Sequence, residues 1–101
     1  MAKRSARDMR PHAKDAAALL KALANDQRLT ILCNLLDGPL SVGDLNARVS
    51  LSQSALSQHL GVLREAGIVT TERESQTIRY SLPAGPTTKI IGILYQEFCA
   101  R

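Results

Sequence analysis

The segment Ser52-Gln-Ser-Ala-Leu-Ser-Gln-His-Leu-Gly-Val-Leu-Arg-Glu-Ala66 decides the fold of this chain. Ser52 is a residue type that caps the start of helices, and Gly67 suits the left-handed turn that ends them, so the segment predicts one helix. Leu56, Leu60 and Leu63 recur at helical spacing and are expected to face a core. Two further apolar residues are expected beside this stripe, Ala55 and Val62.

The opposite face of the same helix carries slim polar groups. Its members lie three or four positions apart and are Ser54, Ser57, Gln58 and Gly61. Serine and glutamine donate and accept hydrogen bonds at base edges, and a glycine lets the backbone come close to DNA. Gln53 is a further candidate for phosphate or base contact, and His59 and Arg64 are candidates for phosphate contact. Because any surface helix has a polar face, this pattern alone leaves an ordinary solvated face as the alternative.

A short helix is predicted just before this segment. Ser41, with Asp44 three residues later, resembles a capping box that opens a helix to Val49. The connection through residues 50–52 is tight, so the two helices form a helix-turn-helix pair. Such a pair inserts its second helix into the major groove of DNA.

Two more amphipathic helices are predicted upstream and one downstream. Residues 14–24 and 25–36 carry apolar side chains at helical spacing, the second with Asn25 as its N-cap. Residues 88–100 predict the last helix, whose apolar face is too broad for one small core. We therefore expect a homodimer through the first and last helices, the alternative being a last helix that covers only its own monomer's core.

After Gly67 the apolar period changes to that of a strand. Ile78, Tyr80 and Leu82 alternate with polar residues, namely Thr77, Arg79 and Ser81. Residues 68–73 supply a partner strand, so the sequence predicts a β-hairpin whose tip lies near residues 74–76 and whose register is open.

The hairpin is predicted to be a wing that straddles a minor groove while the preceding helix fills the major groove. The candidate DNA contacts on it are Arg73 and Arg79 near its ends and Gln76 and Thr77 near its tip. Arg73 pairing with Glu72 or Glu74 on a solvated surface is the alternative. The pattern predicts a mainly α (α+β) fold, a winged helix-turn-helix of about five helices and a two-stranded hairpin, in the order ααααββα over residues 14–101.

Length and charge limit the class of protein. The chain of 101 residues has room for one domain. The net charge of +4 is concentrated in residues 1–14, which predicts a flexible basic arm over residues 1–13 that suits a partner bearing phosphates. A terminus that merely aids solubility explains the same charge.

No enzyme motif, membrane span or secretory signal is recognisable in the sequence. It contains no Cys-x-x-Cys pair, Gly-rich phosphate loop or acid-base constellation. The apolar run at residues 90–95 is too short for a bilayer, and Lys21 interrupts the early apolar stretch. We expect a cytoplasmic protein without a cofactor, in which cysteines are reduced by default. A winged helix that binds only proteins is a rival interpretation.

The run from Leu51 to Val69 is similar to the recognition segment of the ArsR/SmtB family of winged-helix repressors. Residues 24–32 resemble that family's second-helix entry and Arg79-Tyr80 its second wing strand, so the resemblance spans roughly residues 15–100. It implies a two-fold dimer on a near-palindromic double-stranded operator, from which an inducer releases the protein.

Two cysteines, Cys33 and Cys99, are the candidate sensing residues. Metal sensors of the family carry cysteines at the start of the third helix, where this sequence has Ser41 and Gly43, or Asp and His in the last helix, where it has neither, so no metal site is expected. Each cysteine alone also fits as a small apolar filler. Their placement resembles a sulfur- and redox-responsive dithiol branch of the family, which implies that reactive sulfur species or oxidants join them by a disulfide or polysulfide bridge. A metal-responsive or inducer-independent regulator is the alternative.

Overall fold

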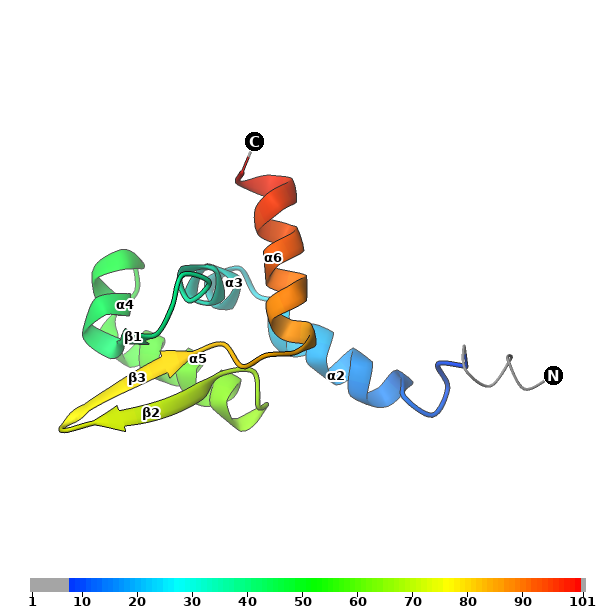
Figure 1. Cartoon of the computed structure of the whole chain (residues 1–101), viewed down its shortest axis with the longest axis horizontal. Coiled ribbons are helices and arrows are strands. Elements are labelled where there is room, and N and C mark those ends of the chain that lie inside the picture. The colour runs from blue at the N-terminus through cyan, green and yellow to red at the C-terminus, as the bar shows by residue number, and fades with distance from the viewer. Residues whose placement is uncertain (1–7, 101) are drawn as a thin grey trace.

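Five helices and a small antiparallel sheet make up residues 8–100, the part of the chain that this computed structural model describes (Figure 1). The elements follow in the order α2 (Ala13–Leu23), α3 (Asp26–Asn34), β1 (Leu40–Ser41), α4 (Val42–Arg48), α5 (Gln53–Glu65), β2 (Thr70–Glu74), β3 (Thr77–Ser81) and α6 (Pro86–Phe98). The predicted mainly helical α+β, winged helix-turn-helix fold is confirmed.

Much of the predicted basic arm, including Lys3, Arg4 and Arg7, lies outside the described residues. Within them, the guanidinium of Arg10 pairs with the carboxylate of Asp8 at 2.6 Å. Among the helices of residues 8–100, none has the length and hydropathy that crossing a membrane requires.

Side-chain caps fix where the central helices begin. The Asn25 side chain accepts hydrogen bonds from two backbone N–H groups at the start of α3. Ser41 and Asp44 form both halves of the capping box on α4, and the Ser52 hydroxyl accepts from the Ala55 N–H at 3.1 Å on α5. These caps satisfy backbone donors that the first helical turn leaves without partners, and the sequence predicted all three.

The sheet has one strand more than the sequence predicts. β1 pairs with β3, with Leu40 opposite Tyr80 and Ser41 opposite Arg79, so the strand order is β1-β3-β2. A strand of two residues is too short to show alternation, which is why the order reads ααβααββα instead of ααααββα.

The register of the hairpin, left open by the sequence, is set by a two-residue tip. Glu74 pairs with Thr77, and Ser75 between them takes a positive φ of 61°. Ile78 and Tyr80 lie on the face of β3 opposite to Arg79, as the alternation predicts.

The core forms where α5 meets the helices before and after it. Leu56, Leu60 and Leu63 are at most 1% exposed and pack with buried residues of the other elements, including Ile31, Leu32, Leu45, Ile68 and Ile91. The prediction that Val62 lies beside this stripe is wrong, since its side chain is 46% exposed. Val62 precedes Leu63 and therefore points about 100° around the helix from it.

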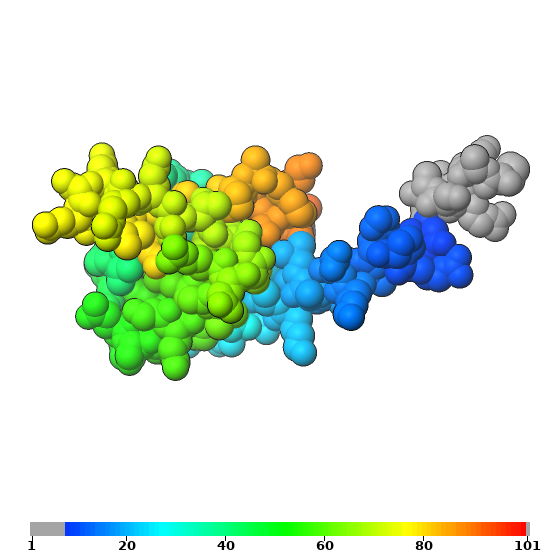
Figure 2. Space-filling model, turned by 90° about the horizontal axis from the view of Figure 1, so that it is seen from below, coloured from blue at the N-terminus to red at the C-terminus, as the bar shows by residue number. Residues whose placement is uncertain are grey.

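Helices α2 and α6 lie at the edge of this core. In Figures 1 and 2, α2 extends away from the body of the molecule, and in Figure 1 the end of α6 points away from the sheet. Of α2 only Leu23 is buried, and of α6 only Thr87 and Ile91. Both helices therefore leave apolar side chains uncovered.

Candidate nucleic-acid interface and cysteine pair

The polar face of α5 points away from the core. Burial of Leu56, Leu60 and Leu63 forces this orientation, because all three lie on one side of the helix. The side chains on the outer side are exposed, and these are Gln53, Ser54, Ser57 and Gln58. A Cβ atom added to Gly61 would meet nothing within 4 Å, so this protein's own packing does not require glycine there. The face is exposed and open to a partner.

His59 and Arg64 lie at the margins of this face. The Arg64 side chain is exposed and forms no ion pair with any residue of the described range 8–100. His59 is half-buried. Arg64 is therefore the freer of the two to reach a phosphate.

The turn that joins α4 to α5 is held by a side chain that the sequence analysis missed. The Asn46 amide donates to the Leu51 carbonyl oxygen at 3.1 Å, across the connection between the two helices. Asparagine is a common partner of turn carbonyls, but its spacing to Leu51 matches no standard capping pattern. Asn46 thus fixes the approach of α5 to α4.

The wing lies beside α5 on the same side of the molecule, as Figures 1 and 2 agree. Gln76 and Thr77 are exposed at its tip. Arg73 is exposed and makes no ion pair within residues 8–100, so the alternative in which it pairs with Glu72 or Glu74 does not form. Helix α5 and the tip of the wing together present hydroxyl, amide and guanidinium groups.

Arg79 differs from the other candidate contacts because it is already paired. Its Nε donates to Glu74 Oε1 at 3.1 Å, and its Nη1 lies 3.8 Å from Asp44 Oδ2. The pKa of Asp44 lies below its ordinary value, first because the Ser41 N–H and hydroxyl group hydrogen-bond with this residue, and then because Arg79 and Arg48 are nearby. Asp44 is therefore a carboxylate at neutral pH.

Cys33 and Cys99 lie on two helices that contact each other, α3 and α6. Cys33 lies in α3 and is partly buried, whereas Cys99 caps the end of α6 and is exposed; both are free thiols. Burial raises the pKa of Cys33, and the negative charge of a Cys99 thiolate raises it further. The two sulfur atoms are thus within electrostatic reach of each other. Within residues 8–100, no three His, Cys, Asp or Glu side chains are placed to hold a metal ion together.

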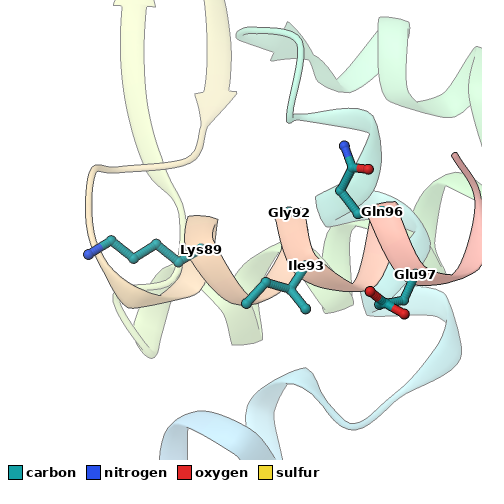
Figure 3. A pocket seen from close by; sticks show the side chains of 5 residues that line it. All are labelled: Lys89, Gly92, Ile93, Gln96 and Glu97. Carbon is teal, nitrogen blue, oxygen red and sulfur yellow. The ribbon is translucent and has the colours of Figure 1, made fainter.

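A groove of about 570 Å³ runs along the outer side of α6 (Figure 3). Its lining is mostly apolar and comprises Lys89, Gly92, Ile93, Gln96 and Glu97. In Figure 3 the Ile93 and Glu97 side chains lie on one side of the helix and Gln96 on the other. A Cβ atom added to Gly92 would meet nothing within 4 Å.

Comparison with known sequences finds a bacterial family. The model described as "Bacterial regulatory protein, arsR family" matches residues 25–71, which include α3, α4 and α5. The chain is 49% identical over 92 residues to the transcriptional activator HlyU of Vibrio cholerae, covering 91% of this chain and 85% of HlyU. It is 48% identical over 92 residues to the biofilm growth-associated repressor of Agrobacterium fabrum, covering 91% and 79% of the two chains.

Solved structures show the same relationship. Reduced HlyU from Vibrio cholerae superposes with a TM-score of 0.85 at 49% identity, covering 90% of this chain and 96% of that one. The transcriptional repressor BigR from Xylella fastidiosa superposes with a TM-score of 0.83 at 43% identity, covering 92% of each chain.

The two thiols are predicted to react at different rates with iodoacetamide. Cys99 is alkylated first, because it is exposed, and Cys33 more slowly, because only the thiolate reacts and a raised pKa leaves little thiolate near neutrality. The Cys33 rate rises as the pH increases toward that pKa. In Cys99→Ser protein the Cys33 rate increases at those pH values where Cys99 would be a thiolate, since the like charge that raises the pKa of Cys33 is gone. Mass spectrometry of timed samples measures both rates, and equal labelling at neutral pH contradicts the prediction.

Proposed function

This chain belongs to the ArsR family of bacterial regulatory proteins, and from that premise we propose that it is a dimeric repressor which binds near-palindromic operator DNA and leaves it when Cys33 and Cys99 become joined. It is a transcriptional regulator and not an enzyme. The observation that carries the proposal is the exposed polar face of α5 beside the wing, in a molecule whose two thiols lie on the contacting helices α3 and α6, away from that face.

Helix α5 reads the major groove in this proposal. Gln53, Ser54, Ser57 and Gln58 hydrogen-bond to base edges, with Gly61 allowing close approach. His59 and Arg64 contact phosphates. Arg73, Gln76 and Thr77 of the wing reach the adjacent minor groove, with Arg73 at the phosphates that border it. The support for these roles is that most of these side chains are exposed and that α5 and the wing share one side of the molecule.

The second copy covers α2 and α6. Leu20 on α2 is 56% exposed, and Ile93 and Phe98 on α6 are 62% and 75% exposed. Scattered exposed apolar residues are ordinary, but here they gather on two helices that carry few buried residues, next to an apolar groove. A two-fold partner buries them and places two α5 helices about 34 Å apart, one turn of DNA.

The relatives include a protein named as an activator and proteins named as repressors. The Agrobacterium and Xylella relatives are named repressors, whereas HlyU is named an activator. We propose repression here because the Agrobacterium relative and those of two Xylella strains are named repressors. One solved HlyU structure is named as that of the reduced protein, and this supports the redox chemistry proposed here for Cys33 and Cys99.

The sensing reaction uses the unequal exposure of the two thiols. The exposed Cys99 thiolate attacks a sulfane sulfur of a polysulfide, which gives a Cys99 persulfide and a polysulfide one sulfur shorter. The Cys33 thiolate then attacks the Cys99 sulfur, forming the disulfide and releasing hydrosulfide. With an oxidant in place of the polysulfide, the two thiols lose two protons, and the oxidant takes the two electrons.

The bridge is coupled to DNA through α6, which carries both Cys99 and the dimer surface. Joining Cys99 to Cys33 draws the end of α6 against α3, because the Cα atoms of a disulfide lie within about 7 Å. The partner helix follows, and the spacing of the two α5 helices changes. A coupling of about 1 to 3 kcal/mol weakens binding about 5-fold to 150-fold.

Ile93→Glu is predicted to convert the dimer to a monomer. A carboxylate in the centre of the apolar groove loses its water when the second copy docks, which disfavours association. Sedimentation velocity at micromolar concentration measures the change. Val62→Glu is the matched control, since Val62 is also an exposed aliphatic residue but lies on α5, and it leaves the dimer intact. A parent protein that sediments as a monomer contradicts the proposed assembly.

Gln58→Ala and Arg64→Gln are predicted to affect DNA binding differently. With a duplex selected by the protein from randomised DNA, Gln58→Ala costs about 1 to 3 kcal/mol of sequence discrimination and leaves the salt dependence unchanged. Arg64→Gln weakens binding to all sequences and lowers the slope of log K against log salt by about 1. Fluorescence anisotropy over a salt series separates these effects. Failure to select any duplex refutes the DNA-binding proposal.

Cys33→Ser is predicted to keep the protein on DNA in the presence of polysulfide. The parent releases the selected duplex, whereas the variant acquires sulfur at Cys99 but forms no bridge and stays bound. Cys99→Ser also stays bound and acquires no sulfur at that position. Anisotropy measures release from DNA, and intact-mass measurement records the added sulfur. Release of Cys33→Ser protein at the polysulfide concentration that releases the parent contradicts the proposed switch.

A further inference from the structure

Arg79 joins three elements at the base of the DNA-facing surface. Its side chain comes from β3, its Nε–H donates to Glu74 at the end of β2, and its Nη1 stands at ion-pair distance from Asp44 in the first turn of α4. The 3.1 Å contact is a hydrogen bond, and the 3.8 Å contact is electrostatic only. One guanidinium therefore lies between two carboxylates from different parts of the fold.

Backbone pairing holds Arg79 close to Asp44. Ser41 of β1 lies opposite Arg79 in the sheet, and Asp44 follows three residues later within the capping box. The Asp44 carboxylate accepts from the Ser41 N–H at 3.2 Å, so the group that faces Arg79 is itself fixed to the start of α4. The helix-turn-helix and the wing thus meet at Arg79.

We propose that Arg79 is a positioning residue, which holds the wing against the first helix of the helix-turn-helix pair and neutralises Glu74 and Asp44, and that it is not a phosphate contact. This inference rests on the proposed DNA-binding function. Of the two arginines on the wing, Arg73 is then the one that meets phosphate, since it makes no ion pair within residues 8–100.

The positive charge of Arg79 matters because two carboxylates lie near the surface that is proposed to meet DNA. Phosphates repel carboxylates, and Glu74 stands at the tip of the wing while Asp44 begins the helix preceding α5. With Arg79 in place, both negative charges have a cation between them. Exposed ion pairs add little to stability, so the role concerns the angle and charge of the wing and not the folding of the domain.

A double-mutant cycle on DNA affinity tests the assignment. The variants are Arg79→Gln, Asp44→Asn, Glu74→Gln and their combinations, with Arg73→Gln as the matched control, measured on the selected duplex over a salt series. Asparagine at position 44 retains the oxygen that accepts from Ser41, so the cap on α4 survives. Thermal denaturation confirms that each variant is folded.

Arg79→Gln is expected to weaken binding with no change in the salt slope, whereas Arg73→Gln lowers the slope by about 1. The loss caused by Arg79→Gln shrinks by about 2-fold or more when Asp44→Asn and Glu74→Gln are already present, because both carboxylates that pair with Arg79 are then neutral. Additive losses together with a slope lowered by about 1 in Arg79→Gln overturn the proposal and make Arg79 a phosphate contact.

Amide hydrogen exchange gives a readout that does not involve DNA. Arg79→Gln is expected to accelerate exchange in β2 and β3 by loosening the wing, while the amides of α3 keep their rates. Unchanged exchange in the wing overturns the positioning role, even if the protein selects no duplex. A wing that loosens in a protein that selects no duplex leaves Arg79 as the holding residue and refutes only the DNA-binding function.

Discussion

Burial of one leucine stripe on α5 determines what the rest of the molecule presents to its surroundings. Leu56, Leu60 and Leu63 are almost fully removed from water, and fully burying each such side chain contributes about 1.5 to 3 kcal/mol. A helix has one rotation about its axis that buries all three. The serines and glutamines of α5 are therefore exposed as a consequence of core packing, and their arrangement does not depend on a partner.

Orientation of this helix depends on polar contacts that lie within a few residues of it. Ser52 caps its start, and Asn46 spans the turn from α4 to hold the Leu51 carbonyl. The turn is short, so α4 and α5 can adopt few relative angles, and Ser41 with Asp44 fixes the other end of α4. Burial of the leucines determines which face of α5 is exposed, and these polar contacts determine the direction of the helix axis.

The features predicted from sequence are those with local causes. A cap and a leucine stripe depend only on residues of one helix. The sequence therefore predicts the caps at Asn25, Ser41 and Ser52. It does not predict strand β1, because two residues show no period and their pairing is with the distant β3. The partner of Arg79 at Asp44 and the approach of Cys33 to Cys99 are likewise tertiary events; the second was expected only through family resemblance. Val62 was misplaced because helical spacing assigns a face only to within about one residue.

The proposed switch depends on the separation of two sites, since the DNA-facing surface lies on α5 and the wing and the two cysteines lie on α3 and at the end of α6. The α5 and wing surface lies away from the cysteines, so the proposed sulfur reaction would change no group on that surface. It acts on α6, which has few buried residues and an apolar outer side, and such a helix moves at smaller energetic cost than α5, whose leucines are locked in the core. Because both copies of α5 are rigid within their own subunits, a shift of α6 is passed on as a change in the distance between them. A dimer that reads two grooves is sensitive to that distance, whereas a monomer would not be. In the proposed switch, dimerisation is therefore the step that would let a reaction at Cys99 influence operator binding.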